Sequence, residues 1–142
     1  MDFIVEKLTK VKKHGPYHAP AYLLQSIRRS VSPHFDSILI LNHKLPETLL
    51  LTIAERNHTE IQLIKEFDCG IYHVQNGILF DRNSTIIVFQ LMPFDQEISL
   101  AEQFCELYGA RAVLVKPFAI ANLYEICLDE RRTGGRYGTL AK

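Results

Sequence analysis

The sequence predicts a mixed α/β (α+β) fold, in which a central mixed sheet contains an antiparallel hairpin meander and is flanked by helices. Its 142 residues, 47% of them hydrophobic, are enough for one domain with its own core. Short apolar runs, typical of buried strands, alternate with segments of helical periodicity. The pair Asn76-Gly77 suits the positive φ angles of a type I′ hairpin. We therefore expect a single α/β domain over residues 1–131, with an N-terminal helical extension (1–33), and a flexible basic C-terminal tail over residues 132–142.

The N-terminal third of the chain is expected to form two helices before the first strand. Apolar residues at helical spacing predict a short amphipathic helix over residues 2–13, which stops at the breaker Gly15-Pro16. A second helix is expected over residues 20–30, because proline is favoured in a first helical turn. The continuous apolar run within residues 36–42 predicts a buried strand. A proline then opens a helix over residues 46–56, for which an asparagine supplies a suitable end.

The middle of the chain is expected to form an antiparallel meander. Residues 60–67 have the pattern of a strand, residues 71–80 form a hairpin about Asn76-Gly77, and residues 85–92 are strongly apolar. We expect residues 85–92 to be the central and most buried strand of the sheet. Residues 85–116 are also the one strand-helix-strand passage that could form a right-handed parallel crossover.

The last third is expected to contain a helix, a strand and a final helix. Ser99 and Glu102 have the spacing of a capping box, whose side chains bond free N–H groups at a helix start. Gly109 suits the left-handed residue that commonly ends a helix. Residues 112–115 are predicted to be a buried strand, and residues 119–130 the last helix.

Charge and cysteine content limit the classes of function. Residues 1–44 hold seven basic and three acidic residues (+4), residues 45–110 three and ten (−7), and residues 111–142 six and three (+3). This asymmetry can mark a nucleic-acid surface or an acidic surface for a basic partner, or the basic ends can simply fold onto the acidic centre. No apolar run approaches a membrane span, the N-terminus lacks a signal-peptide pattern, and three widely spaced cysteines form no disulfide framework. We therefore expect a cytoplasmic protein without membrane contact.

Catalytic and metal-binding motifs are not recognisable in the sequence. His14 and His18 have the spacing of a helical ligand pair, but Gly15-Pro16 between them breaks a helix. No phosphate loop, dinucleotide fingerprint or nucleophile elbow occurs. Cys105 and Cys127 fall in predicted helices, where cysteine usually acts as a small apolar residue. We expect no catalytic residue, no metal and no cofactor.

Residues 46–117 resemble the core of the PD-(D/E)XK nuclease superfamily, in which an acidic helix precedes three antiparallel strands, a helix and a final strand. The resemblance implies a Mg²⁺ site whose vestigial candidates are Glu55 (or Glu47) on the helix, Asp81 and Gln90. Met92 stands where the family has its lysine. The resemblance therefore implies a non-catalytic domain that binds nucleic acid, or a protein that processes it, and an active metal-dependent nuclease only if a Mg²⁺ site remains.

Nucleic-acid binding implies phosphate contacts by the basic residues of both chain ends. These side chains can equally be solvated helix termini, since a helix C-terminus favours positive charge. The predicted contacts are Lys10, Lys12, Lys13, Arg28, Arg29, Arg131, Arg132 and Arg136.

Residues 35–46 resemble, as an alternative, the third strand of a response-regulator receiver domain, with Asn42 at the position of the phosphoacceptor. Residues 109–118 resemble its fifth strand, with Lys116-Pro117 at the end. An asparagine cannot form the acyl-phosphate, so this resemblance implies a protein-interaction or regulatory module without a nucleic-acid role. A homo-oligomer is compatible with either alternative.

Overall fold

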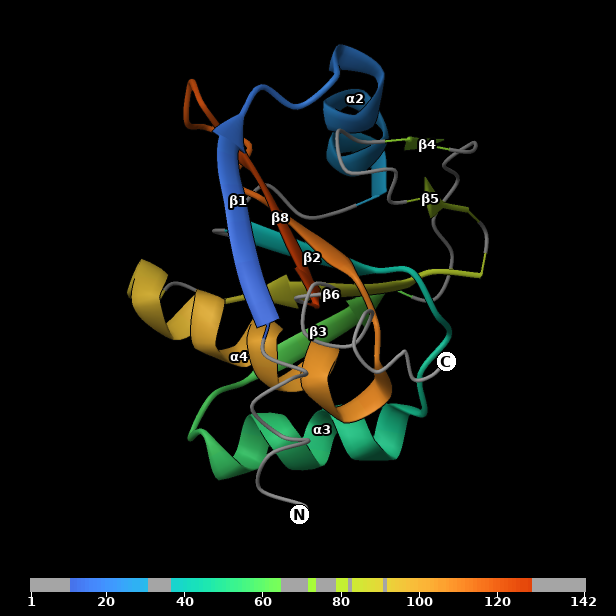
Figure 1. Ribbon diagram of the computed structural model, residues 1–142, viewed down its shortest axis with the longest axis vertical. Coiled ribbons are helices and arrows are strands. Elements are labelled where there is room, and N and C mark those ends of the chain that lie inside the picture. Colours follow the sequence, from blue (N-terminus) through green and yellow to red (C-terminus); the bar gives the residue numbers. More distant parts are fainter. Residues whose placement is uncertain are drawn as a thin grey trace, which may run out of the picture.

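Over the residues that it describes, the computed structural model has a six-stranded sheet, a separate two-stranded sheet and three helices (Figure 1). It describes residues 11–30, 37–64, 72–73, 79–81, 83–90 and 92–128. In chain order the elements are β1 (Val11–Tyr17), α2 (Ala21–Ser30), β2 (Ser37–Leu41), α3 (Glu47–Arg56), β3 (Ile61–Ile64), β4 (Tyr72–His73), β5 (Leu79–Phe80), β6 (Thr85–Phe89), α4 (Phe94–Tyr108), β7 (Ala112–Val115) and β8 (Leu123–Leu128). The expected mixed α/β class is confirmed.

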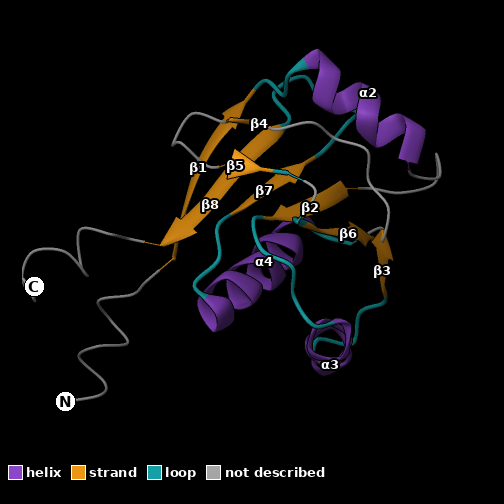
Figure 2. Cartoon of the chain, turned by 90° about the vertical axis from the view of Figure 1, so that its right-hand side faces the viewer, coloured by secondary structure: helices purple, strands orange, loops and turns teal. Residues whose placement is uncertain are grey.

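The large sheet has the strand order β1-β8-β7-β2-β6-β3, and neighbouring strands are antiparallel throughout. Two strand-helix-strand units interlock within it. The unit β2-α3-β3 spans β6, and the unit β6-α4-β7 spans β2, so each unit encloses one strand of the other. Figure 2 shows that α3 and α4 cover one face of the sheet, whereas α2 and the small β4-β5 sheet lie on the other.

The alternation of side chains along the strands divides the core into two layers. Every residue of β2, β6 and β7 is buried, which agrees with their continuous apolar sequences. Leu39 of β2 packs in the layer beneath α3 and α4, together with Leu50 and Phe104 of those helices. Ile38, the preceding residue, packs in the opposite layer with Leu23 of α2.

Helix α4 begins five residues before Ser99, so the predicted capping box does not start it. Pro93 precedes the helix, and acidic residues in the first turn suit the positive end of the helix dipole. The Ser99 hydroxyl instead accepts a hydrogen bond from Gln103 Nε2 at 3.3 Å. Gly109 ends the helix with a φ of 63°, as predicted, and Asn57 ends α3.

The predicted last helix is wrong, because residues 123–128 form β8. The predicted first helix is wrong over residues 11–13, because residues 11–17 form β1. These strands pair with each other from Val11 opposite Leu128 to Tyr17 opposite Leu123. Local apolar spacing suited a helix in both segments, but pairing between distant segments decided the structure. Residues 2–10 of the first predicted helix and residues 129–130 of the last lie outside the described residues, as does the predicted tail.

Gly15 forms a bend inside β1 rather than a stop after a helix. Its φ is 120°, and the register of β1 against β8 shifts between His14 and Tyr17. A Cβ at position 15 would lie 2.8 Å from the Leu123 carbonyl oxygen, so both the backbone conformation and the space favour glycine.

The predicted hairpin pairs as expected but does not belong to the large sheet. Tyr72 lies opposite Phe80 and His73 opposite Leu79, whereas Asn76-Gly77 lies outside the described residues. Strand β3 pairs directly with β6. Strand β6 is fully buried, as predicted, but it ends at Phe89 and is not central, because the two middle positions belong to β7 and β2.

Candidate functional site

A group of polar and aromatic side chains gathers where β2 begins, β7 ends and α4 begins. Antiparallel pairing brings the first residue of β2 beside the end of β7. The first turn of α4 lies on the face of the sheet that α3 and α4 cover (Figure 2). We call this group the Glu97 cluster, and its members are Lys13, Ser37, Phe94, Glu97, Lys116 and Tyr124.

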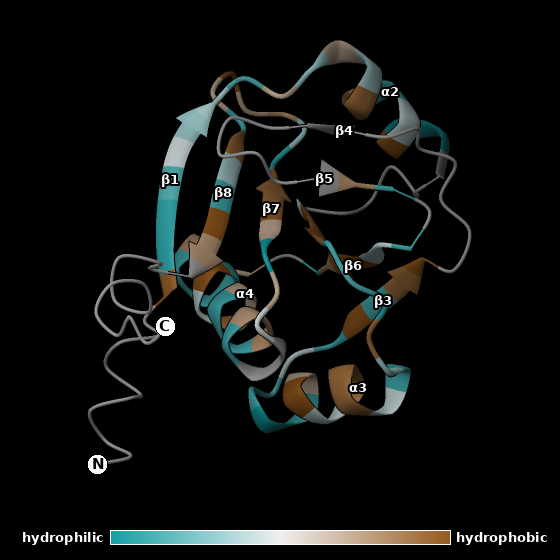
Figure 3. Ribbon diagram, turned by 45° about the vertical axis from the view of Figure 1, so that its right-hand side comes forward, coloured by the Kyte–Doolittle hydropathy of each residue, from teal (hydrophilic) through white to brown (hydrophobic). Residues whose placement is uncertain are grey.

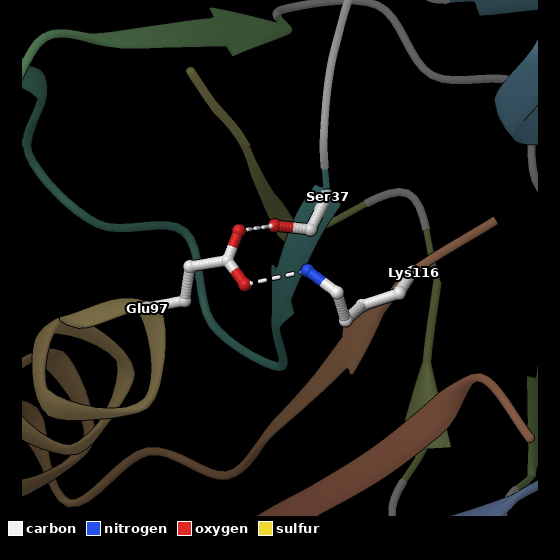
Figure 4. A network of polar contacts seen from close by, with 3 residues as sticks. All are labelled: Ser37, Glu97 and Lys116. Atoms are coloured by element: carbon white, nitrogen blue, oxygen red, sulfur yellow. Dashed lines mark hydrogen bonds and ion pairs between the residues drawn. The ribbon is translucent and has the colours of Figure 1, made fainter. Parts of the chain in front are cut away.

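Glu97 is the centre of the cluster and is completely buried. Its Oε1 accepts a hydrogen bond of 2.8 Å from Lys116 Nζ, and its Oε2 accepts one from Ser37 Oγ (Figure 4). Ser37 is also fully buried, whereas 22% of the Lys116 side chain is exposed. One carboxylate in α4 therefore connects the start of β2 with the residue that follows β7.

Two aromatic rings form the second half of the cluster. The centroids of Phe94 and Tyr124 are 4.9 Å apart, with a tilt of 48° between the ring planes. Lys13 Nζ lies 5.3 Å from the Phe94 centroid and 5.6 Å from that of Tyr124. Lys116 Nζ lies 5.6 Å from the Phe94 centroid. Two ammonium groups therefore lie within cation–π distance of the same ring.

The burial of these groups decides what the cluster can do chemically. Ser37 and Glu97 are fully enclosed, so a dissolved molecule cannot reach the hydroxyl or the carboxylate. Lys13 is exposed and Lys116 partly so, and both rings are partly exposed. The arrangement therefore presents positive charge and apolar ring surface to a ligand, with Glu97 holding Lys116 in place. Among the described residues, no group of three or more histidine, cysteine, aspartate or glutamate side chains is arranged for a metal ion.

The predicted basic surface is only partly assembled by the fold. Lys13 belongs to the Glu97 cluster, whereas Lys12, the preceding residue of β1, points to the other face of the sheet. Arg28 and Arg29 are exposed in the last turn of α2. The end of α2 is remote from the start of β1 in both Figure 1 and Figure 2. The remaining predicted contacts, Lys10, Arg131, Arg132 and Arg136, lie outside the described residues.

The nuclease-type candidates are placed apart from one another. Asp81 and Gln90 lie beyond opposite ends of β6, whose five residues alone span about 16 Å. Asp81 organises a turn, in which its Oδ1 accepts a hydrogen bond from the Asn83 amide at 2.8 Å. Glu55 is exposed near the end of α3, and Glu47 begins that helix.

Asn42 and Lys116, which carry the receiver-type resemblance, lie at opposite ends of the paired strands β2 and β7. The amide nitrogen of Asn42 donates to the Arg111 carbonyl at 3.0 Å. Asn42 Oδ1 accepts from the Arg111 amide nitrogen at 2.9 Å. Asn42 therefore closes the end of the strand ladder and does not meet Lys116.

Sequence reasoning named Lys13 as a phosphate contact and Lys116 in the receiver-type resemblance. It did not name the other members of the cluster, which are Ser37, Phe94, Glu97 and Tyr124. The one local signal for the site is Glu97, because an acid is favoured in the first turn of a helix. That signal depends on the start of α4 at Phe94. Tyr124 could not be found, because the sequence predicted a helix where β8 forms.

Comparisons with family models, with curated proteins and with solved structures give no match for this chain. In the described part of the chain, no helix has both the length and the apolar character needed to cross a lipid bilayer.

Cys105 is a buried thiol on α4, away from the Glu97 cluster. Its pKa is raised from 9.0 to about 12, mainly because burial disfavours the charged thiolate, with smaller contributions from Cys127, Glu102 and Glu106. Its Sγ lies 4.0 Å from the Ile126 carbonyl oxygen.

The raised pKa of Cys105 predicts a loss of stability in alkaline solution. In the unfolded chain this thiol ionises near pH 9, whereas the folded protein keeps it protonated up to about pH 12. The unfolded state therefore binds fewer protons in that interval, and Cys105 should lower the free energy of unfolding by about 1.4 kcal/mol per pH unit. We expect urea titrations above pH 9 to show a steeper loss in the wild type than in Cys105→Ala. Equal slopes in the two proteins would contradict this assignment.

Proposed function

We propose that the protein is a non-catalytic domain that binds single-stranded nucleic acid at the Glu97 cluster. The observation that supports this most is the convergence of Lys13 and Lys116 on one aromatic pair. Lysines attract phosphates, and partly exposed rings can stack with bases regardless of sequence. Glu97 cancels one of the two positive charges, so the two lysines and Glu97 together carry +1.

The resemblance of residues 46–117 to a nuclease core supports nucleic acid as the ligand. The separation of Asp81 from Gln90 supports binding without cleavage, as does Met92 at the position of the family's lysine. We place this activity in the cytoplasm, in keeping with three cysteines that form no disulfide pattern.

The proposal predicts binding whose dependence on salt changes with Lys13. A labelled oligothymidylate, followed by fluorescence anisotropy, should bind the wild type more weakly as salt is raised. Lys13→Ala should lower the affinity and reduce the slope of log affinity against log salt by about 0.7, because one phosphate contact is lost. The matched control is Lys44→Ala, since Lys44 is an exposed lysine remote from the cluster, beyond the opposite end of β2 from Ser37. That variant should bind like the wild type.

Two outcomes would contradict the proposed function. One is the absence of binding at low salt, and the other is an equal loss of affinity in Lys13→Ala and Lys44→Ala. Loss only in a variant with Arg28 and Arg29 reversed in charge would move the site to the end of α2.

The same samples with Mg²⁺ or Mn²⁺ should show no nicking of plasmid DNA. Cleavage that disappears in Gln90→Ala would instead establish a metal-dependent nuclease.

A further inference from the structure

The two edges of the large sheet differ in how they are protected against further strand pairing. Strand β1, at one edge, contains Lys12, Lys13 and Pro16 and an irregular register, which are features that discourage the addition of another strand. Strand β3, at the other edge, has the sequence Ile-Gln-Leu-Ile and contains neither proline nor a charged residue. Figure 3 shows the same contrast, with β1 largely hydrophilic and β3 largely hydrophobic.

Within the described residues, β3 pairs with β6 alone. In an antiparallel sheet, alternate residues of an edge strand direct their backbone N–H and C=O groups away from the neighbouring strand. The outer edge of β3 therefore offers backbone donors and acceptors to an added strand.

Two hollows lie between α3 and β3, one toward each end of the strand. The first has a volume of about 600 Å³ and is lined in part by Leu51 and Ile61. The second has a volume of about 330 Å³ and is lined in part by Leu50, Leu63 and Ile64. Successive same-side residues of an extended peptide are about 7 Å apart, which is also the distance from Ile61 to Leu63 along β3. The two hollows can therefore receive different side chains of one added strand.

The surroundings of these hollows are apolar, and those of the larger one are also acidic. Leu49 and Leu51 on α3 are 43% and 45% exposed, although both are large and hydrophobic. Glu55 and Glu60 line the larger hollow together with His58. In the smaller hollow Glu47 is balanced by Lys44, so the acidic character belongs to the larger hollow. An occupant with basic side chains would complement these carboxylates.

We propose that the edge of β3 and the two hollows beside α3 form a docking site for an extended segment of a partner protein. The segment adds a strand to the sheet and alternates apolar with basic side chains. A second copy of this chain is a poorer occupant, because a symmetric contact through this surface would bring its carboxylates together. The inference does not depend on the nucleic-acid proposal, since the Glu97 cluster contains no residue of α3 or β3.

The test uses the full chain and a synthetic peptide of alternating lysine and valine. We expect saturable binding by isothermal calorimetry, together with increased protection of β3 amides in hydrogen exchange. Glu55→Lys combined with Glu60→Lys should weaken binding at least tenfold. Glu106→Lys is the matched control, because Glu106 is an exposed acid on α4 outside the hollows, and it should leave the affinity unchanged.

Four results would overturn the docking site. The first is no binding at peptide concentrations up to about 1 mM, where the binding free energy would be only about −4 kcal/mol. The second is equally tight binding of a peptide that alternates glutamate and valine. The third is protection confined to amides outside β3. The fourth is protection of β3 by self-association without peptide, which would make a second copy the occupant. Oligothymidylate binding by the Glu55→Lys/Glu60→Lys variant separates this test from that of the proposed function.

Discussion

Replacement of Phe104 by alanine is expected to lower the free energy of unfolding by about 4 kcal/mol. Phe104 lies on α4 and is fully buried in the core layer that also contains Leu39 of β2, Leu50 of α3 and Leu114 of β7. Its ring therefore contacts the region where two helices meet the centre of the sheet. Alanine would remove most of the buried side chain and leave a cavity that the surrounding strands cannot fill, because they are held by pairing on both sides.

Urea unfolding followed by circular dichroism measures this effect as a lower midpoint with an unchanged slope. The matched control is Leu49→Ala, since Leu49 is a large apolar residue on α3 that is 43% exposed. It should cost less than about 1 kcal/mol. A cost this small for Phe104→Ala would mean that the ring does not fill the core as described. Since domains are commonly stable by only about 5–15 kcal/mol, the Phe104 variant should be near its limit of stability.

Replacement of Glu97 by alanine is expected to cost about 3 kcal/mol. The change leaves the buried Ser37 hydroxyl without this acceptor and removes the carboxylate that binds Lys116. This cost is at the lower end of the range for a broken buried ion pair, because the Lys116 side chain is 22% exposed and its ammonium group can be hydrated. Asp95→Ala is the matched control, since Asp95 is an exposed acid in the same helical turn, and it should cost about 0.5 kcal/mol at most.

A double-mutant cycle with Lys116→Met isolates the ion pair from the other effects of Glu97→Ala. We expect a coupling free energy of about 1 kcal/mol or more, because the two groups are in direct contact. Simple additivity of the two variants would show that Glu97 does not hold Lys116. The Glu97→Gln variant keeps the shape of the side chain but not its charge. Its affinity for the oligonucleotide shows whether the position of Lys116 matters for binding.

Elements whose signals are local could be predicted from the sequence. The apolar run of β2, the proline before α3 and the glycine after α4 each act within a few residues of the element they define. Strands β1 and β8 could not be predicted, because each is stabilised by pairing with the other across more than a hundred residues. The six-residue strand β8 also contains Glu125, a charged residue that is fully buried in the fold.

The candidate site was harder to predict than the fold, for the same physical reason. Lys13 could be named as a candidate, because basic charge is visible in a sequence. Phe94, Glu97 and Tyr124 come together only through the order of strands in the sheet, which no local pattern specifies. The separation of Asn42 from Lys116 depends on strand direction, which is likewise a property of the assembled sheet.

The interlocked crossover units also determine when this chain can fold during synthesis. Strand β2 has no complete set of neighbours until β6 and then β7 have left the ribosome, because its two partners begin at Thr85 and Ala112. Strand β1 waits longer, since its only partner among the described strands is β8. Strands β2, β3 and β6 can pair with one another before Ala112 is synthesised, but a nascent chain of that length exposes the apolar edge of β2. The half of the sheet that contains β7, β8 and β1 should form last, because its pairing depends on the C-terminal strands.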